Sequence, residues 1–221
     1  MNKLEFKCVG DKIEINKDFC NKLYIDKRKD PIGMPPRKSI PKPFQCILGR
    51  FFHKKIILNC YDFSKPEESI IVSAPNGRHI VSCKLSEEQS LIVSLSSLFG
   101  WSSGIELKTR FSLQPATFAL GKLFHVLVTG DGYLFFELNG SLMQHDYNAS
   151  YGKSIDFSRM IAWETSSRFR VVGSSKLIDI YFSQLHLEQT YGDIVLLDSD
   201  DPSEGGGGLW KRFFSKFYIP K

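Results

Sequence analysis

The sequence lacks the long apolar segments that mark membrane-spanning and secreted proteins. No run of apolar residues among the 221 approaches the roughly 20 that a helix needs to cross a bilayer. The first residues carry Glu5, Asp11 and Glu14 without a continuous apolar stretch, unlike a secretory signal or an acid-poor mitochondrial presequence. We therefore expect the cytoplasm or another reducing compartment, or mitochondria if a presequence has been removed.

Closely spaced metal ligands are also missing. The cysteines are odd in number and widely spaced, without a C-x-x-C pair: Cys8, Cys20, Cys46, Cys60 and Cys83. This pattern predicts small buried residues in a reducing compartment rather than disulfides or a structural zinc site. The histidines occur singly, without H-x-H or H-E-x-x-H: His53, His79, His125, His145 and His186. We predict no metal and no cofactor; a metal on His53, His125 and a carboxylate is the weaker alternative.

Positive charge is concentrated near the start of the chain. Residues 1–50 hold 12 basic and six acidic residues, whereas the rest holds 17 and 18. Part of the excess lies in residues 26–43, which also contain five of the ten prolines. Proline at this density interrupts strand pairing, so we expect a solvated loop or an extended connector. Its charge could also meet phosphate or acidic lipid.

An internal repeat is the strongest positive signal. SIIVSAPNG ends at Gly77 and GYLFFELNG ends at Gly140, and each is an apolar stretch that closes on Asn-Gly, a strong turn signal. Both continue through a short strand, a polar turn and an alternating strand to an apolar segment that ends at Trp101 or Trp163. A fainter copy begins with NKLEFKCVG, which ends at Gly10 and has no closing tryptophan.

The repeats define the expected fold class. Short strands with period-two alternation and turn signals every 8–12 residues are typical of sandwiches and barrels, and helix signals are weak. We predict an all-β single domain of about three tandem divergent repeats over residues 1–190. An acidic and glycine-rich linker with an aromatic-basic C-terminal arm is expected over residues 191–221.

A connecting element recurs between the repeats. LGRFFH (48–53) and LGKLFH (120–125) each lead into a strand, and LWKRFFS (209–215) near the end of the chain resembles them. This similarity suggests that the tail is the third copy of the connecting element.

The residues singled out for contacts lie in this tail. Tryptophan and phenylalanines fall at i, i+3, i+4 and i+7, surrounded by basic residues: Trp210, Lys211, Arg212, Phe213, Phe214 and Phe217. As a helix they would form one aromatic face, typical of a peptide at a membrane interface. The stretch is only about three turns long, so three hypotheses stay open. The tail can dock on its own domain, exchange onto another subunit, or contact a membrane.

Two glycine-bearing motifs could suggest chemistry. GWSSG (100–104) matches the G-x-S-x-G nucleophile motif formally, but the following IELKTRF alternates like a strand, whereas a hydrolase elbow requires a helix. We interpret Ser102 as a turn serine and keep a serine hydrolase as the unlikely alternative. TGDGY (129–133) lacks the lysine of a phosphate loop and predicts a hairpin turn.

The repeats resemble the altered-inheritance-of-mitochondria, or mitochondrial biogenesis, family and its bacterial homologues. The resemblance rests on SIIVSAPNGRHIVSCKL, SLIVSLSSLFGWSSGIEL and RMIAWETSSRFRV, and on the glycine-leucine-basic pattern of LGRFFHKKIILN and GGGGLWKRFF. It covers residues 44–190 well and the N-terminus poorly. It implies a tandem β architecture similar to the tryptophan RNA-binding attenuator protein, a link to inner-membrane organisation, and no established enzymatic role or catalytic residues.

These observations favour a non-enzymatic scaffold or assembly protein that self-associates, with contact to a membrane surface as a further prediction. A ligand- or RNA-binding β module is the alternative. Nucleic acid is the weaker form of that alternative because no RNP-type motif occurs and the charge outside residues 1–50 is nearly balanced.

Overall fold

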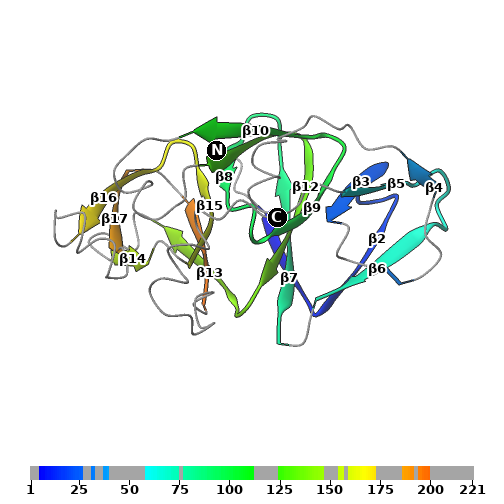
Figure 1. Cartoon of the computed structure of the whole chain (residues 1–221), viewed down its shortest axis with the longest axis horizontal. Helices are drawn as coiled ribbons and strands as arrows, with labels where there is room; N and C mark the ends of the chain where they lie inside the picture. The colour runs from blue at the N-terminus through cyan, green and yellow to red at the C-terminus, as the bar shows by residue number, and fades with distance from the viewer. Residues whose placement is uncertain are drawn as a thin grey trace, which may run out of the picture.

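Antiparallel pairing joins all the β-strands that the computed structural model describes (Figure 1). The described residues are 5–26, 31–32, 37–39, 58–74, 77–111, 124–146, 154–156, 159–172, 186–191 and 194–199. After a leading strand, β1 (Glu5–Gly10), the strands fall into three consecutive units, whose boundaries lie at the repeated glycines Gly10, Gly77 and Gly140. The all-β prediction is therefore confirmed.

Unit A (residues 11–76) contains β2 (Lys12–Asn16), β3 (Lys22–Asp26), β4 (Arg37–Ser39), β5 (Leu58–Asp62) and β6 (Ser69–Ser73). Unit B (residues 77–139) contains β7 (His79–Leu85), β8 (Ser90–Val93), β9 (Leu98–Ser102), β10 (Ile105–Phe111), β11 (Phe124–Gly130) and β12 (Gly132–Leu138). Unit C (residues 140–199) contains β13 (Leu142–Asp146), β14 (Ser154–Asp156), β15 (Met160–Glu164), β16 (Arg168–Val172), β17 (His186–Tyr191) and β18 (Ile194–Asp198).

Units B and C use the same pairing scheme. In unit B, β12 pairs with β7 and β9, while β11 pairs with β10 and β8. In unit C, β18 pairs with β13 and β15, while β17 pairs with β16 and β14. Each of these two units therefore consists of two groups of three paired strands, which we call leaflets. In the first leaflet the sixth strand of the unit lies between the first and the third. In the second leaflet the fifth strand lies between the second and the fourth. The predicted repeats are confirmed at the level of strand pairing.

The described strands of unit A follow the same scheme. Its first leaflet has β2 on β6, and its second leaflet has the order β3-β5-β4. Between β3 and β4 the structure describes Pro31 and Ile32, and Ile32 bridges to Ile71 of β6 with N···O distances of 2.9 Å. Proline has no N–H to donate, so Pro31 cannot itself donate a ladder hydrogen bond beside this bridge. The predicted connector therefore also holds this bridge and β4.

Consecutive units are joined by pairing between leaflets. The third strand of unit B, β9, pairs with the second strand of unit A, β3, and β15 of unit C pairs in the same way with β8 of unit B. The joints produce a seven-stranded sheet, β1-β7-β12-β9-β3-β5-β4, and a six-stranded sheet, β10-β11-β8-β15-β18-β13. The leaflets at the two ends of the series, β2-β6 and β14-β17-β16, remain separate sheets.

In Figure 1, β14, β16 and β17 lie at one end of the long axis, and β2 and β6 lie at the other end with β3, β5 and β4 of the seven-stranded sheet. A hydrophobic cluster fills each of the three interfaces between successive sheets. The middle strands are therefore buried on both faces: in β12, Phe135 packs towards β2-β6, whereas Leu134 and Phe136 pack towards the six-stranded sheet. Such strands have near-continuous apolar sequences instead of strict alternation.

The third connecting element is β17, not the tail. In unit B the element LGKLFH runs into β11, and β11 pairs with the fourth strand of its unit. In unit C the strand with that pairing is β17, which begins at His186 as β11 contains His125. β17 therefore takes in unit C the place in the repeat that the sequence suggested for the tail. Residues 209–215 themselves lie outside the described residues.

The last described strand also changes the expected end of the β domain. β18 pairs on both sides within the six-stranded sheet, although residues 191–198 were assigned to an acidic linker. Its Val195, Leu196 and Leu197 are buried, and so is the carboxylate of Asp198 at 5% exposure. The acidic residues of LLDSD made this strand resemble a linker in the sequence. The charge of Asp198 gives no sign that its carboxylate is buried and hydrogen-bonded within the fold.

Candidate functional site

Ser102 does not lie in a nucleophile elbow. It is the last residue of β9, and β10 begins three residues later, so the geometry is strand–turn–strand rather than strand–turn–helix. The side chain is buried, and its Oγ accepts a hydrogen bond from the backbone N–H of Tyr133 at 2.9 Å. This bond ties the β9–β10 turn to the start of β12. TGDGY forms a turn between β11, which ends at Gly130, and β12, which begins at Gly132. The predicted hairpin is wrong, because β11 and β12 belong to different sheets and do not pair with each other.

The described histidines and acidic residues form no metal-binding group. Among the residues that the structure describes, no cluster of three or more histidine, cysteine, aspartate or glutamate side chains could hold an ion. His79 begins β7 and is exposed, whereas His145 lies on β13 and is half-buried. The weaker metal hypothesis involves His53, His125 and a carboxylate. His53 lies outside the described residues.

Three described cysteines are free thiols: Cys20, Cys60 and Cys83. Burial raises the pKa of Cys83 to about 12. Burial also raises the pKa of Cys20 to about 12, with a smaller contribution from nearby Cys60. Because the thiolate is the nucleophile, these two thiols are protonated and unreactive near neutral pH. This agrees with the expectation of small buried residues for these cysteines.

A hollow of about 580 Å³ opens at the edge of the seven-stranded sheet and has the clearest chemistry in the described part of the chain. We call it the β1 hollow; it is lined by Phe6, Lys7, Phe19, Ser82, Lys84, Tyr133 and Gln144. It exists because the two-stranded sheet covers only part of the outer face. β2-β6 packs over Ile80 and Phe135 but leaves the next rows of β1, β7 and β12 uncovered.

Strand pairing places the ammonium groups of two lysines beside two aromatic rings. Lys7 lies opposite Ser82, and Lys84 lies opposite Tyr133 one row away on the same face. Such diagonal neighbours have Cα atoms about 7–8 Å apart, so both lysines can reach one anion. Phe19, from the turn after β2, meets the Tyr133 ring edge-on with centroids 5.2 Å apart. The hollow suits an anionic group joined to a flat apolar group.

The basic groups beside the hollow are Lys7 and Lys84, and Glu5 of β1 lies opposite Lys84 in the ladder. Lys7 and Lys84 are exposed, and neither forms an ion pair with a carboxylate in the described part of the chain. The floor between them is Ser82, which is 3% exposed and whose Oγ lies 3.5 Å from the carbonyl oxygen of Lys7. Sequence analysis missed this site because its residues come from β1, β7, β12 and a turn, and no local motif connects them.

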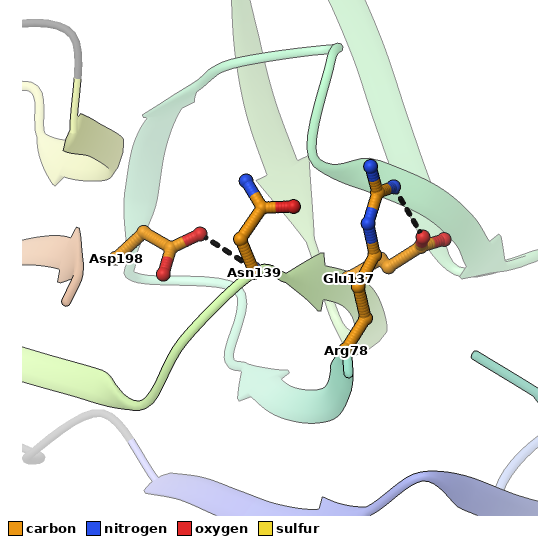
Figure 2. Close-up of polar contacts among 4 residues, drawn as sticks. All are labelled: Arg78, Glu137, Asn139 and Asp198. Atoms are coloured by element: carbon orange, nitrogen blue, oxygen red, sulfur yellow. Dashed lines mark hydrogen bonds and ion pairs between the residues drawn. The ribbon is translucent and has the colours of Figure 1, made fainter. Parts of the chain in front are cut away.

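Two polar contacts hold the turns between units (Figure 2). The carboxylate of Asp198, from β18, accepts hydrogen bonds from the backbone N–H groups of Asn139 and Gly140 at 2.7 and 2.8 Å. Arg78, just after the Gly77 turn, donates to Glu137 near the end of β12 at 2.6 Å. Both contacts anchor an Asn-Gly turn or its neighbour to a strand far away in sequence. The Asn-Gly turn signals thus mark the boundaries between consecutive units.

The six tail residues predicted to make contacts, Trp210, Lys211, Arg212, Phe213, Phe214 and Phe217, lie outside the described residues. No helix in the described part of the chain is long and apolar enough to span a membrane.

Comparison with protein families identifies the class of protein to which this fold belongs. Residues 39–191 match the model of the mitochondrial biogenesis AIM24 family. Because this match covers more than half of the chain, the protein belongs to that family, as the resemblance of its repeats predicted. The match begins at the last residue of β4 and ends with β17, so it includes β5 and β6 of unit A, all of unit B and the strands of unit C except β18.

The solved structures include a similar bacterial protein. The crystal structure of protein SPYM3_0169 from Streptococcus pyogenes aligns with a TM-score of 0.60 and 13% sequence identity. The alignment covers 90% of this chain and 94% of that chain. At this identity the similarity concerns the fold alone. No curated protein matches the chain.

Proposed function

We propose that the protein is a non-enzymatic scaffold or assembly protein that associates with further copies of itself. The observation that carries the proposal is the joint between units, in which the edge strand of one leaflet pairs with the edge strand of the next. A chain built by adding leaflets edge to edge can add those of another chain by the same backbone bonds. Membership of the mitochondrial biogenesis family supports a role in assembly and a place in mitochondria.

The edge of β13 is the best surface for such an association. Within the described residues, β13 is the last strand of the six-stranded sheet and pairs only with β18. Its Met143 is 47% exposed, one of only three large apolar side chains in the described part of the chain that are exposed. An exposed apolar edge strand is a template for pairing with another chain.

Sedimentation velocity of the full-length chain tests this proposal. We expect an oligomer that dissociates on dilution, and we expect Met143→Lys to shift it towards monomer because a charge on an edge strand opposes pairing. Ser64→Lys adds the same charge in the exposed turn between β5 and β6 and should leave the oligomer intact. A monomer at every concentration would contradict the proposal, as would equal effects of the two substitutions.

We also propose that the protein acts at a membrane surface. The sequence of the tail supports this part of the proposal. The apolar spacing from Trp210 to Phe217 fits an interfacial helix of about three turns. Such a short helix binds membranes weakly alone, so several tails in one oligomer would be needed for firm attachment.

The β1 hollow supports a second candidate function, a ligand-binding β module. Phenyl phosphate joins a dianion to an aromatic ring and is a suitable probe for calorimetric titration. We expect saturable binding that falls about tenfold in Lys7→Gln or Lys84→Gln, because each removes a charge-assisted contact. Lys65→Gln, at an exposed turn, serves as the control and should bind as the original protein does. Binding that is unaffected by either hollow substitution would exclude this site.

A further inference from the structure

The turn between units B and C contains a dipeptide with its own chemistry, Asn139 followed by Gly140. In such a pair the backbone nitrogen of the glycine can attack the side-chain Cγ of the asparagine, because glycine has no Cβ to obstruct the approach. The new N–Cγ bond closes a five-membered succinimide, and the side-chain NH₂ leaves as ammonia with the proton of the glycine nitrogen. Water then opens the ring to aspartate or isoaspartate. This reaction, deamidation, consumes only water.

One buried carboxylate holds the backbone nitrogens on both sides of the Asn139 α-carbon. Asp198 Oδ2 accepts the N–H of Asn139 at 2.7 Å (Figure 2), and Asp198 Oδ1 accepts the N–H of Gly140 at 2.8 Å. These two nitrogens are the end atoms of the ψ torsion of Asn139. Successive N–H groups converge on one anion in a turn-like nest conformation. The succinimide instead requires the Gly140 nitrogen to be nearly eclipsed with the Asn139 Cβ, so the nest keeps it away from Cγ.

The carboxylate also opposes the loss of the Gly140 proton, which the attack requires. The anionic nitrogen would lie 2.8 Å from Asp198 Oδ1, and like charges in contact disfavour ionisation. A carboxylate is itself a weak base, so it binds this proton without removing it. Gly140 is buried, so hydroxide reaches its N–H only when the turn opens. Conformation and charge therefore act in the same direction, against deamidation.

The surrounding contacts hold Asp198 in this position. It lies opposite Leu142 in the β13–β18 ladder, and its own carbonyl oxygen accepts a hydrogen bond from Arg159 Nε at 2.8 Å. Beyond the turn, the N–H of Ser141 donates to Ser199 Oγ at 2.7 Å, and the N–H of Ser199 donates to the Ser141 carbonyl at 2.9 Å. The turn can therefore release the carboxylate only when this end of the six-stranded sheet opens.

We propose that Asn139 is a latent deamidation site, which the Asp198 carboxylate keeps unreacted while the boundary between units B and C is closed. Isoaspartate at position 139 inserts one extra backbone carbon between the two nitrogens that bind the carboxylate. The product no longer fits Asp198, so the reaction loosens this boundary irreversibly. The inference is independent of the proposed self-association through β13 and of the β1 hollow.

Peptide mapping by mass spectrometry, after incubation of the full-length chain in mildly alkaline buffer, measures aspartate and isoaspartate at position 139. The rate should rise about tenfold or more in Asp198→Ala, because loss of two charge-assisted hydrogen bonds makes the open turn more frequent. Asp198→Asn keeps one acceptor oxygen and should give a smaller rise. A synthetic peptide of residues 136–143 supplies the rate without protection.

Ser102→Ala is the matched control for general loosening of the fold. It removes the acceptor of another backbone N–H, that of Tyr133, at the opposite end of β12 from Asn139. It should change the rate at Asn139 by less than about twofold. Circular dichroism checks that each variant is folded at the incubation temperature.

The comparison of these variants can overturn the proposal in three ways. An unchanged rate in Asp198→Ala would reject protection by the carboxylate. A slower rate in Asp198→Ala would show that the carboxylate promotes the attack. Equal rises in Asp198→Ala and Ser102→Ala would show that deamidation follows global opening of the fold rather than release of this turn.

Discussion

Gly130→Ala should lower the free energy of unfolding by more than about 4 kcal/mol, the largest effect that we expect from a single methyl group in this protein. Gly130 has φ +110°, where residues with a side chain are rarely found. A Cβ at this position would overlap the carbonyl oxygen of Gly104 in the facing β9–β10 turn. Backbone atoms on both sides leave no flexible group that could move aside.

The neighbouring glycines show why this contact matters. A Cβ on Gly104 would overlap the carbonyl oxygen of Asp131, and a Cβ on Gly132 would overlap the Oγ of Ser102. The same Ser102 Oγ accepts the hydrogen bond from the Tyr133 N–H. The β9–β10 turn and the β11–β12 turn therefore pack backbone against backbone, and any added atom separates them.

Gly77→Ala is the matched control for Gly130→Ala. Gly77 also has a positive φ, +79°, but a Cβ there would meet nothing within 4 Å. Its cost is backbone strain alone, about 1–2 kcal/mol. Urea unfolding followed by circular dichroism measures both variants. Similar losses for the two would show that the glycine contact between the turns contributes little.

Asp198→Ala should destabilise the protein by about 3 kcal/mol. The substitution leaves the N–H groups of Asn139 and Gly140 without their acceptor in a site where Asp198 is 5% exposed, and each unsatisfied buried donor costs about 1–3 kcal/mol. Asp198→Asn retains one acceptor oxygen and should lose about half as much. Thermal or urea unfolding monitors all three proteins.

Asp62→Ala supplies the comparison for Asp198→Ala. Asp62 pairs with Lys22 at 3.1 Å, but both side chains are partly exposed, at 31% and 46%. A surface ion pair of this kind contributes at most about 1 kcal/mol. If Asp62→Ala and Asp198→Ala cost the same, burial of Asp198 would not explain its importance for the turn.

Several features of the fold follow from local chemistry and were predictable. The Asn-Gly turns ending at Gly77 and Gly140 separate strands, because the turn residues act within four residues of sequence. Trp101 and Trp163 hold equivalent strand positions because the repeated apolar segments form the same joint. The interpretation of Ser102 as a turn serine also came from the alternating residues that follow it.

Other features depend on contacts between distant segments. β18 looked like the start of a linker because LLDSD ends in acidic residues, and only the turn at Asn139 explains a buried Asp198. The tail resembled the third connecting element until the pairing of β17 with β16 and β14 filled that place. The β1 hollow needs Lys7 and Lys84, 77 positions apart, on adjacent strands of one sheet.

The sequence alone determined that the fold is all-β, that it contains an internal repeat, and which family it resembles. These features could be predicted because turn residues and apolar periodicity act over short distances. Tertiary structure decided which strands pair and how consecutive units are joined. Those outcomes depend on register between segments far apart in the chain, and a shift of one residue turns every side chain to the opposite face. Local sequence does not encode that register, whereas burial of both faces of the middle strands selects it.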